Sequence, residues 1–567
     1  MKTNTRRAAV ARFALALCAI APNLAWGQCA KGAEYAQSDA VRQRYPDPAV
    51  RFDTPAFAPG KTTFTTHEEM VGYLAKLADR SGNMLMRIAG HSQEGRVLPM
   101  LVFTDSGRYA PAELKRLNRP IVVLIGQMHG NEPAGGEAML ALAKSLAEGE
   151  LKPLLERITV VIMPRANPDG AYYFWRGTAA CVDVNRDHVK VDLPETGAIR
   201  RLTQELEPDV FVDAHEFSVA TRWLQKFGAI QSYDFTFAYA THPNVDSRLT
   251  DMAESVFSRN IARDVGSAGY SHFWYYTTGY NVADKRVAGG GTAPDIGRNY
   301  AGLQNALSFL VETRGVGIGR DSFARRVHTQ YAVLSSLLRS TADNAAVVRK
   351  LTQAVRDETV RKGLAPVAGD TLAVTLKMPA RAQSLTMTDP DTGEAKAVEV
   401  EWIDPREAVP AISRSRPYAY LVLPSHFEVA RRLEKSGIAW RRLNAPVELE
   451  VESYEVTDRR QGSVFVEGHI RSTVTTEVRT RKRLFPAGTF VYAMAQPGAN
   501  IIAAALEPES VSSFVSLGIV PTDKRGLANP QEAAPSEVPI YRLLKPAALD
   551  TQPAMLKRPT SVPSVSP

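Results

Sequence analysis

The chain has 567 residues, of which 44% are hydrophobic and 23% are charged, and its formal net charge is +8 at pH 7. These fractions are ordinary for a globular protein, and the length predicts two to four domains at about 150 residues each. The positive excess is small for so long a chain, so we expect no nucleic-acid partner.

The first 27 residues have the order of a secretory signal peptide. Basic residues without any acidic one stand within residues 1–12, an apolar stretch follows at 13–20, and Ala25 and Gly27 occupy the −3 and −1 positions of a cleavage site before Gln28. The apolar stretch is too short to span a membrane, and no later stretch approaches the roughly 20 apolar residues of a spanning helix. We therefore expect an exported protein, periplasmic or extracellular, without a membrane span; an uncleaved anchor is the alternative. Cleavage lowers the net charge by four, to +4.

Residues 28–60 are polar, contain several prolines and show no clear periodicity, so we expect an extended N-terminal arm. Cys29 and Cys181 are the cysteines that remain once the signal peptide is removed. An oxidising compartment permits a disulfide between them, but the sequence leaves open whether they are bridged.

Residues 61–340 alternate between apolar runs and amphipathic, helix-like segments. The predicted strands lie at 98–103, 120–130, 158–170, 209–217 and 306–315. This alternation predicts an α/β fold with a mostly parallel mixed sheet flanked by helices. In such sheets, binding groups gather at the carboxyl ends of the strands. His129, His215 and Glu312 each close one of these runs, so we expect them to face one cleft.

A second region follows residue 340. Residues 341–369 are predicted to form a helical linker, and residues 370–545 a β-rich domain, because its apolar residues alternate with period two. One helix is predicted near 426–438. The last segment, 546–567, mixes Pro, Ser and Thr and is predicted to be a disordered tail.

The strongest chemical signal is a histidine and a glutamate three residues apart, His129 and Glu132, where a strand turns into a helix. At this spacing both side chains can bend toward one point, as zinc requires of nitrogen and oxygen ligands. A catalytic zinc ion needs a third protein ligand, and His215 fits that place. The spacing alone is weak evidence, because His91 and Glu94 repeat it in what we interpret as a turn between two strands.

Around these residues, six sequence pieces occur in order. They are GHSQEGR (90–96), MHGNEPAGGEA (128–138), RANPDGAYYFWRGT (165–178), VDVNRDH (182–188), DAHEF (213–217) and FLVETRG (309–315). Their order and spacing resemble those of the carboxypeptidase A-type (funnelin) zinc metallopeptidases. The resemblance covers roughly residues 60–325, about half of the chain. The second region is similar in pattern to a β-rich C-terminal extension of some bacterial members.

The resemblance implies a zinc-dependent metallocarboxypeptidase in which His129, Glu132 and His215 hold one Zn²⁺ ion. Zinc polarises the scissile carbonyl and lowers the pKa of water. Glu312 is implied to be the general base, which takes a proton from the attacking water and later delivers one to the leaving amine.

The same resemblance gives roles to residues outside the metal site. Arg176 is implied to stabilise the oxyanion. Asn185 and Arg186 are implied to hold the free C-terminal carboxylate of a peptide substrate, since a guanidinium matches a carboxylate in bidentate geometry. The expected activity is therefore that of an exopeptidase.

The sequence also departs from the family pattern. Asn131 stands where an arginine often precedes the metal-binding glutamate, and Glu216 replaces a more common small residue. The tyrosine that contacts the substrate's terminal residue cannot be placed, with Tyr280 and Tyr300 as candidates. The arm at 28–60 is too short for the pro-domain of digestive members, so we expect no zymogen.

Two alternatives remain open from sequence. One is an N-acyl amino acid amidohydrolase of the aspartoacylase or succinylglutamate desuccinylase type, which shares the His-Gly-Asn-Glu segment and an Asn-Arg pair. The other is a non-catalytic peptide-binding protein on the same fold. Side-chain specificity, oligomeric state and the role of the second domain stay undetermined.

Overall fold

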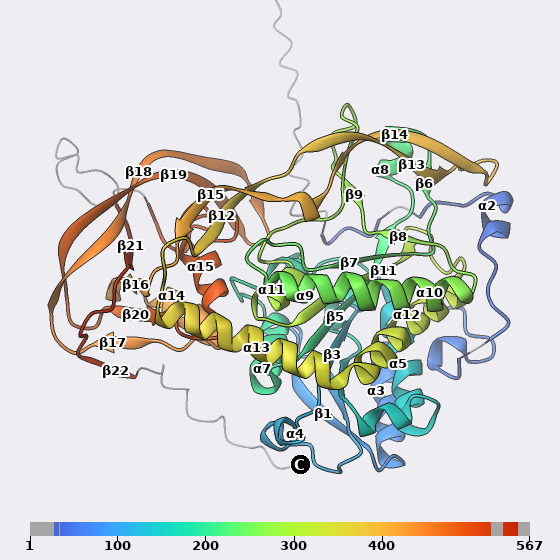
Figure 1. Cartoon of the computed structure of the whole chain (residues 1–567). Helices are drawn as coiled ribbons and strands as arrows, with labels where there is room; N and C mark the ends of the chain where they lie inside the picture. Colours follow the sequence, from blue (N-terminus) through green and yellow to red (C-terminus); the bar gives the residue numbers. More distant parts are fainter. Residues whose placement is uncertain (1–27, 33, 51, 523–536, 554–567) are drawn as a thin grey trace, which may run out of the picture.

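The centre of the N-terminal region is a mixed eight-stranded sheet, in the order β1-β2-β4-β3-β5-β11-β7-β8 (Figure 1). The computed structural model describes residues 28–32, 34–50, 52–522 and 537–553. The strands of this sheet are β1 (Met84–His91), β2 (Val97–Phe103), β4 (Thr159–Met163), β3 (Ile121–Gly126), β5 (Val210–Ser218), β11 (Leu307–Val316), β7 (Phe235–Tyr239) and β8 (His272–Trp274). The central strands β4, β3, β5 and β11 are parallel to one another, and antiparallel pairs flank them. The predicted α/β class is confirmed.

Helices cover both faces of this sheet. The helices between residues 61 and 343 are α3 (His67–Asp79), α4 (Pro111–Arg116), α5 (Pro133–Glu148), α6 (Pro168–Tyr173), α7 (Pro194–Leu206), α8 (Arg222–Phe227), α9 (Ser247–Met252), α10 (Arg259–Ser267), α11 (Gly297–Leu303) and α12 (Phe323–Asp343), of which α8 packs on a second sheet described below. Along β3, Val122 and Leu124 belong to the hydrophobic cluster that contains α5 and α12, while Val123 and Ile125 belong to the cluster that contains α7. Successive side chains of a strand point to opposite faces, so β3 is buried throughout.

The strand ends differ in detail from the prediction. β3 ends at Gly126, and His129 lies three residues further, in the turn that leads into α5. His215 and Glu312 lie within β5 and β11, because these strands continue to Ser218 and Val316. However, the last residue of β3 pairs with Ala214. His215 is therefore the first residue of β5 beyond the end of β3, at the carboxyl edge where the prediction placed it.

The two regions are joined by α12 and by α13 (Ala345–Leu364), which occupies the predicted helical linker. The C-terminal region is built on a seven-stranded sheet. Its strands, in order, are β19 (His469–Phe485), β18 (Val447–Val466), β21 (Glu537–Leu543), β16 (Ala419–Val422), β20 (Phe490–Ala493), β17 (Arg441–Leu443) and β22 (Thr551–Pro553). The predicted helix is present as α14 (Phe427–Lys435). A second helix, α15 (Ala499–Leu506), was not predicted, because its eight residues are all buried and show no amphipathic period.

Strands from both sides of residue 370 share a further sheet, in the order β6-β13-β14-β10-β9. Its members are β6 (Ile230–Gln231), β13 (Ala380–Thr388), β14 (Ala395–Ile403), β10 (Arg286–Ala288) and β9 (Thr277–Thr278). The β13–β14 hairpin thus pairs at each edge with a strand of the N-terminal region. A two-stranded sheet of β12 (Thr371–Lys377) and β15 (Val409–Ser415) connects it to the C-terminal sheet. The domain boundary at 370 stays a prediction.

Both ends of the described chain pack on the body. The arm at 28–60 contains α2 (Asp39–Arg44), and Val41 and Tyr45 are buried. A disulfide joins Cys29 to Cys181, 152 residues apart, which answers the question that the sequence left open. β22 lies within the segment predicted as a disordered tail and pairs with β17. The predicted signal peptide, residues 1–27, lies outside the described residues.

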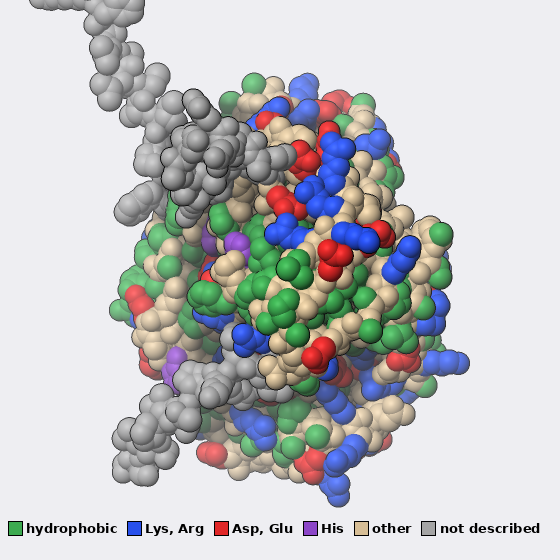
Figure 2. All heavy atoms as spheres, turned by 90° about the vertical axis from the view of Figure 1, so that its left-hand side faces the viewer, with side chains coloured by type: hydrophobic (Ala, Val, Ile, Leu, Met, Phe, Trp, Pro, Cys, Tyr) green, Lys and Arg blue, Asp and Glu red, His purple; other side chains and the backbone are tan. Residues whose placement is uncertain are grey.

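The described surface carries charges of both signs. On the face shown in Figure 2, Lys and Arg side chains are interspersed with Asp and Glu, and hydrophobic side chains lie between them. Among the described helices, none has the length and apolar character that crossing a membrane requires.

The contact between α13 and the C-terminal sheet can be tested at Gly363. A Cβ atom at this position would overlap the backbone of Met494, just after β20. We expect Gly363→Ala to lower the free energy of unfolding by about 2–3 kcal/mol, because backbone atoms cannot move aside as a side chain can. Urea denaturation measures this. Gly72→Ala is the matched control, since Gly72 lies within α3 with open space around it, and it should stabilise by about 0.5–1 kcal/mol. Equal stability of the two variants would contradict the packing argument.

Candidate metal centre

Three buried side chains converge at the carboxyl edge of the sheet. The ligand atoms of His129, Glu132 and His215 lie within 4.8 Å of one another. The Nδ1 atom of His129 is 2.7 Å from one carboxylate oxygen of Glu132, and the Nδ1 atom of His215 is 2.8 Å from the other. The two Nδ1 atoms are 3.0 Å apart. Two imidazole nitrogens and a carboxylate that face one point form a donor set that fits zinc.

A close backbone contact shapes the turn that carries His129 and Glu132. A Cβ atom on Gly130 would overlap the carbonyl group of Gly170, and the Gly130 amide bonds to the Arg176 carbonyl at 3.3 Å. Only glycine permits this approach. Glu132 is the N-cap of α5, whose first residue is Pro133, so the helix begins directly after the ligand.

Each histidine is oriented by a buried carboxylate through its other ring nitrogen. The Nε2 atom of His129 lies 3.0 Å from Asp183, and that of His215 lies 2.6 Å from Asp213. Such partners fix the ring orientation and the tautomer of a metal ligand. The sequence analysis missed both. The signal for Asp213 was its position two residues before His215 in a strand, which places both side chains on one face.

Glu312 faces the metal-binding residues from the neighbouring strand. In the parallel pairing of β5 with β11, Glu312 lies directly opposite His215. Its side chain is 7% exposed. Burial is the main cause that raises the pKa of Glu312 to about 8, and the nearby Glu132 carboxylate adds to the shift while His215 opposes it. The structure therefore brings a carboxyl group with a high proton affinity to the metal-binding residues.

The predicted arginine and asparagine side chains also lie at the site. Arg176 bonds to Asp183 at 2.8 Å and lies 3.5 Å from Glu132, with 35% of its side chain exposed. The Asn185 amide contacts Asp213 at 2.8 Å and the Nε2 atom of His215 at 2.9 Å, so it is engaged within the protein. Arg186 is half-buried and donates to the Asn185 carbonyl at 2.6 Å.

The two candidate tyrosines lie in different surroundings. Tyr280 is 71% exposed and lies under Arg222, and Tyr300 is buried against Arg200. A third tyrosine, Tyr275, lies just after β8 and close enough to Glu312 to feel its charge. Its pKa is raised by burial and by the charge of Glu312.

Gly290, in the glycine run at 289–291, lies against Tyr275. Gly290 has a positive φ of 91°. A Cβ atom there would lie 2.7 Å from the guanidinium of Arg298 and 3.1 Å from the Tyr275 ring. The glycine therefore makes room for both side chains.

Two other features noted in the sequence, Glu216 and the second His-x-x-Glu segment, have structural explanations. Glu216 forms a buried ion pair with Arg326 of α12 at 2.8 Å, and it accepts the Ala134 amide at 2.9 Å. It thus joins α12 to the start of α5. The second His-x-x-Glu segment lies where predicted, at the turn between β1 and β2. There, Glu94 pairs with Arg96 instead of with His91.

Comparison with known proteins agrees with this geometry. The family model for zinc carboxypeptidases matches residues 70–331. The chain is 32% identical to "Carboxypeptidase 2" of Trichophyton rubrum over 473 residues, 82% of this chain and 86% of the relative. It is 30% identical to "Carboxypeptidase 2" of Trichophyton equinum over 493 residues, 86% of this chain and 88% of the relative. A solved metallo-carboxypeptidase from Burkholderia cenocepacia aligns with 48% of this chain and 68% of its own, at 18% identity and a TM-score of 0.37.

The chain belongs to the zinc carboxypeptidase family. It is a metallocarboxypeptidase, a hydrolase with zinc as its cofactor, as the motifs predicted. The matches to the fungal relatives are longer than the family model, so the similarity extends beyond the N-terminal region.

Metal analysis tests the three ligands. We expect the purified protein to contain one zinc ion per chain, measured by plasma mass spectrometry, and His215→Ala to lose it, because two ligands do not complete the site. His91→Ala is the matched control, since His91 belongs to the pair of equal spacing on the protein surface. Full zinc content in His215→Ala would show that the metal is held elsewhere.

Proposed function

We propose that the protein is an exported zinc carboxypeptidase that removes C-terminal residues from peptides. The observation that carries the proposal is the position of Glu312, opposite His215 and beside three convergent metal-binding side chains. A carboxylate at this place can accept a proton from a water molecule at the metal, and it lies outside the group of three metal-binding side chains. The names of the fungal relatives support the same activity.

We assign the metal to His129, Glu132 and His215. A zinc ion held there would polarise the scissile carbonyl and lower the pKa of a water molecule. Glu312 accepts the proton of the attacking water and then gives a proton to the leaving amine, acting in turn as general base and general acid. Its position supports this role, since Glu312 is buried directly opposite His215, beside the place where such a water molecule would be held.

We assign charge stabilisation to Arg176 and recognition of the chain end to Arg186 with Asn185. The Arg176 guanidinium lies beside Glu132 and is partly exposed, so it can also contact a substrate carbonyl. Arg186 can form bidentate bonds with a terminal carboxylate. The amide of Asn185 is bonded to Asp213 and His215, so Asn185 contributes by fixing the segment that carries Arg186.

We also propose that residues 1–27 are a cleaved signal peptide and that the protein works outside the cytoplasm. The Cys29–Cys181 disulfide supports this, because disulfides persist in oxidising compartments. Cys29 would be the second residue of the cleaved chain.

Peptide hydrolysis is the direct test. We expect the zinc-loaded protein to shorten peptides that have a free C-terminal carboxylate. The same peptides with an amidated C-terminus should be cleaved at least tenfold more slowly, because a neutral amide does not form an ion pair with Arg186. Mass spectrometry of the products from a peptide mixture gives the rates and the preferred terminal residue. Cleavage of N-acetyl or N-succinyl amino acids without cleavage of peptides would favour the amidohydrolase alternative.

The role of Glu312 is tested by Glu312→Gln. We expect kcat to fall by about 10²- to 10⁴-fold, the usual contribution of a general base, while the zinc content stays at one ion per chain. Glu94→Gln is the control, because this carboxylate lies in the pair of equal spacing outside the site. An unchanged kcat in Glu312→Gln would show that Glu312 is not the general base.

A further inference from the structure

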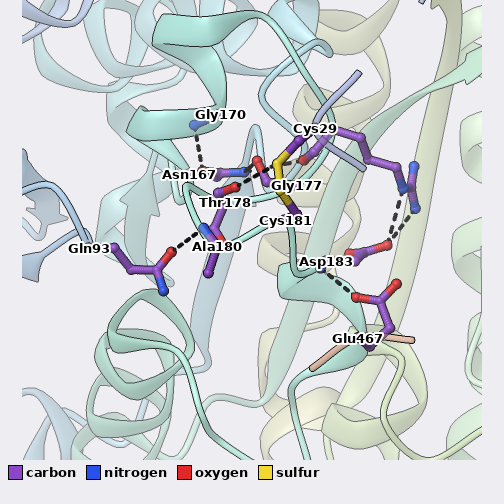
Figure 3. Close-up of a disulfide and its surroundings, with 11 residues drawn as sticks. Cys29, Gln93, Asn167, Gly170, Gly177, Thr178, Ala180, Cys181, Asp183 and Glu467 are labelled. Atoms are coloured by element: carbon purple, nitrogen blue, oxygen red, sulfur yellow. Dashed lines mark hydrogen bonds and ion pairs between the residues drawn. A yellow bond between two sulfur atoms is a disulfide. The ribbon is translucent and has the colours of Figure 1, made fainter. Parts of the chain in front are cut away.

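A hairpin of the C-terminal region reaches the metal centre. β18 and β19 are joined by the two residues Glu467 and Gly468, and this tip lies against the N-terminal region. One carboxylate oxygen of Glu467 accepts the backbone amide of Asp183 at 2.6 Å, and the other accepts the side-chain amide of Gln28 at 3.0 Å. Figure 3 shows Glu467 beside Asp183, next to the Cys29–Cys181 disulfide. Glu467 is 8% exposed, so this contact is shielded from water.

Two further residues of β19 hold the hairpin against the same region. His469 contacts Asp192 at 2.8 Å, and Arg471 contacts Asp295 at 3.1 Å. His469 and Arg471 are two positions apart in β19, so they lie on one face of this strand, which begins directly after the tip that carries Glu467. One face of the hairpin therefore touches the segment with Asn185 and Arg186 and also the loop that precedes α11.

The backbone at the tip indicates that the Glu467 side chain is needed for more than the turn. Glu467 and Gly468 have φ values of 51° and 84°. A two-residue hairpin turn with both φ values positive strongly prefers Asn-Gly, Asp-Gly or Gly-Gly. Glutamate is less suited to the left-handed conformation than asparagine. A strained residue that is held in place by specific contacts is a candidate for a functional role.

Asp183 explains what the contact can do. Its carboxylate bonds to the Nε2 atom of His129 at 3.0 Å, to Arg176 at 2.8 Å and to the backbone amide of Asn185 at 2.7 Å. One side chain thus orients a metal ligand, the proposed oxyanion arginine and the segment that carries Arg186. Glu467 fixes the backbone of Asp183 and through it all of these groups.

We propose that Glu467 is a positioning residue of the catalytic centre, delivered by the C-terminal region through the tip of the β18–β19 hairpin. The proposal rests on the proposed function for its kinetic test. It assigns the C-terminal region a part in the reaction, because without the hairpin the buried amide of Asp183 loses its acceptor.

Three variants of the full-length zinc protein test the proposal. Glu467→Asn suits the turn better than glutamate but is too short to keep the bond to Asp183. We expect kcat to fall at least tenfold and zinc to dissociate at least tenfold faster in a chelator competition, as for other residues that orient metal ligands, while Tm is equal or higher. Glu467→Gln keeps an oxygen acceptor and should retain kcat within about threefold. Glu477→Asn is the control, since Glu477 lies exposed on β19 of the same hairpin and pairs with Arg479.

Each other outcome overturns the proposal. These outcomes are unchanged kcat and zinc release in Glu467→Asn, equal losses in Glu467→Asn and Glu467→Gln, or a lowered Tm that accounts for the loss of activity. If the unmodified enzyme cleaves no peptide, the proposed function fails. The rate of zinc release still decides the role of Glu467 in that case.

Discussion

The burial of charged groups at the edge of the sheet is the constraint on which the rest of the structure depends. His129, Glu132, His215 and Glu312 are each at most 7% exposed, and buried ionisable groups are stable only when they are paired or bind a metal. The protein meets this requirement with a second layer of charges, in which Asp183 and Asp213 contact the histidines and Arg176 contacts Asp183. Because these partners come from segments far apart in sequence, the site also ties those segments together.

Site residues that lie close together in the sequence could be predicted from it. Residues that reach the site through contacts between distant segments were missed. His129 and Glu132 are three residues apart, so their convergence follows from one turn. Glu312 was predicted from family motifs, while its place opposite His215 depends on the register of two parallel strands. The role of Asp183 was missed, because nothing in the local pattern distinguishes a residue that orients a ligand from an ordinary buried side chain.

The same reasoning applies to the fold. The central strands were predicted because both of their faces are covered, which gives continuous apolar runs. The sequence did not predict that β13 and β14 pair with strands of the N-terminal region. Their partners are very short: β6 has two residues and β10 has three. Strands so short carry no usable period in a sequence. The C-terminal region is therefore joined to the N-terminal region by a shared sheet as well as by the helical linker.

The contact between Gln28 and Glu467 spans 439 positions and has a consequence for biosynthesis. The segments with the metal ligands are made before the hairpin, because His129, Glu132 and His215 precede Glu467 in the chain. Glu467 reaches Asp183 only after most of the chain has left the ribosome. The proposed positioning of the metal centre by Glu467 is therefore completed only late in the synthesis of the chain, after all three metal-binding residues have been made.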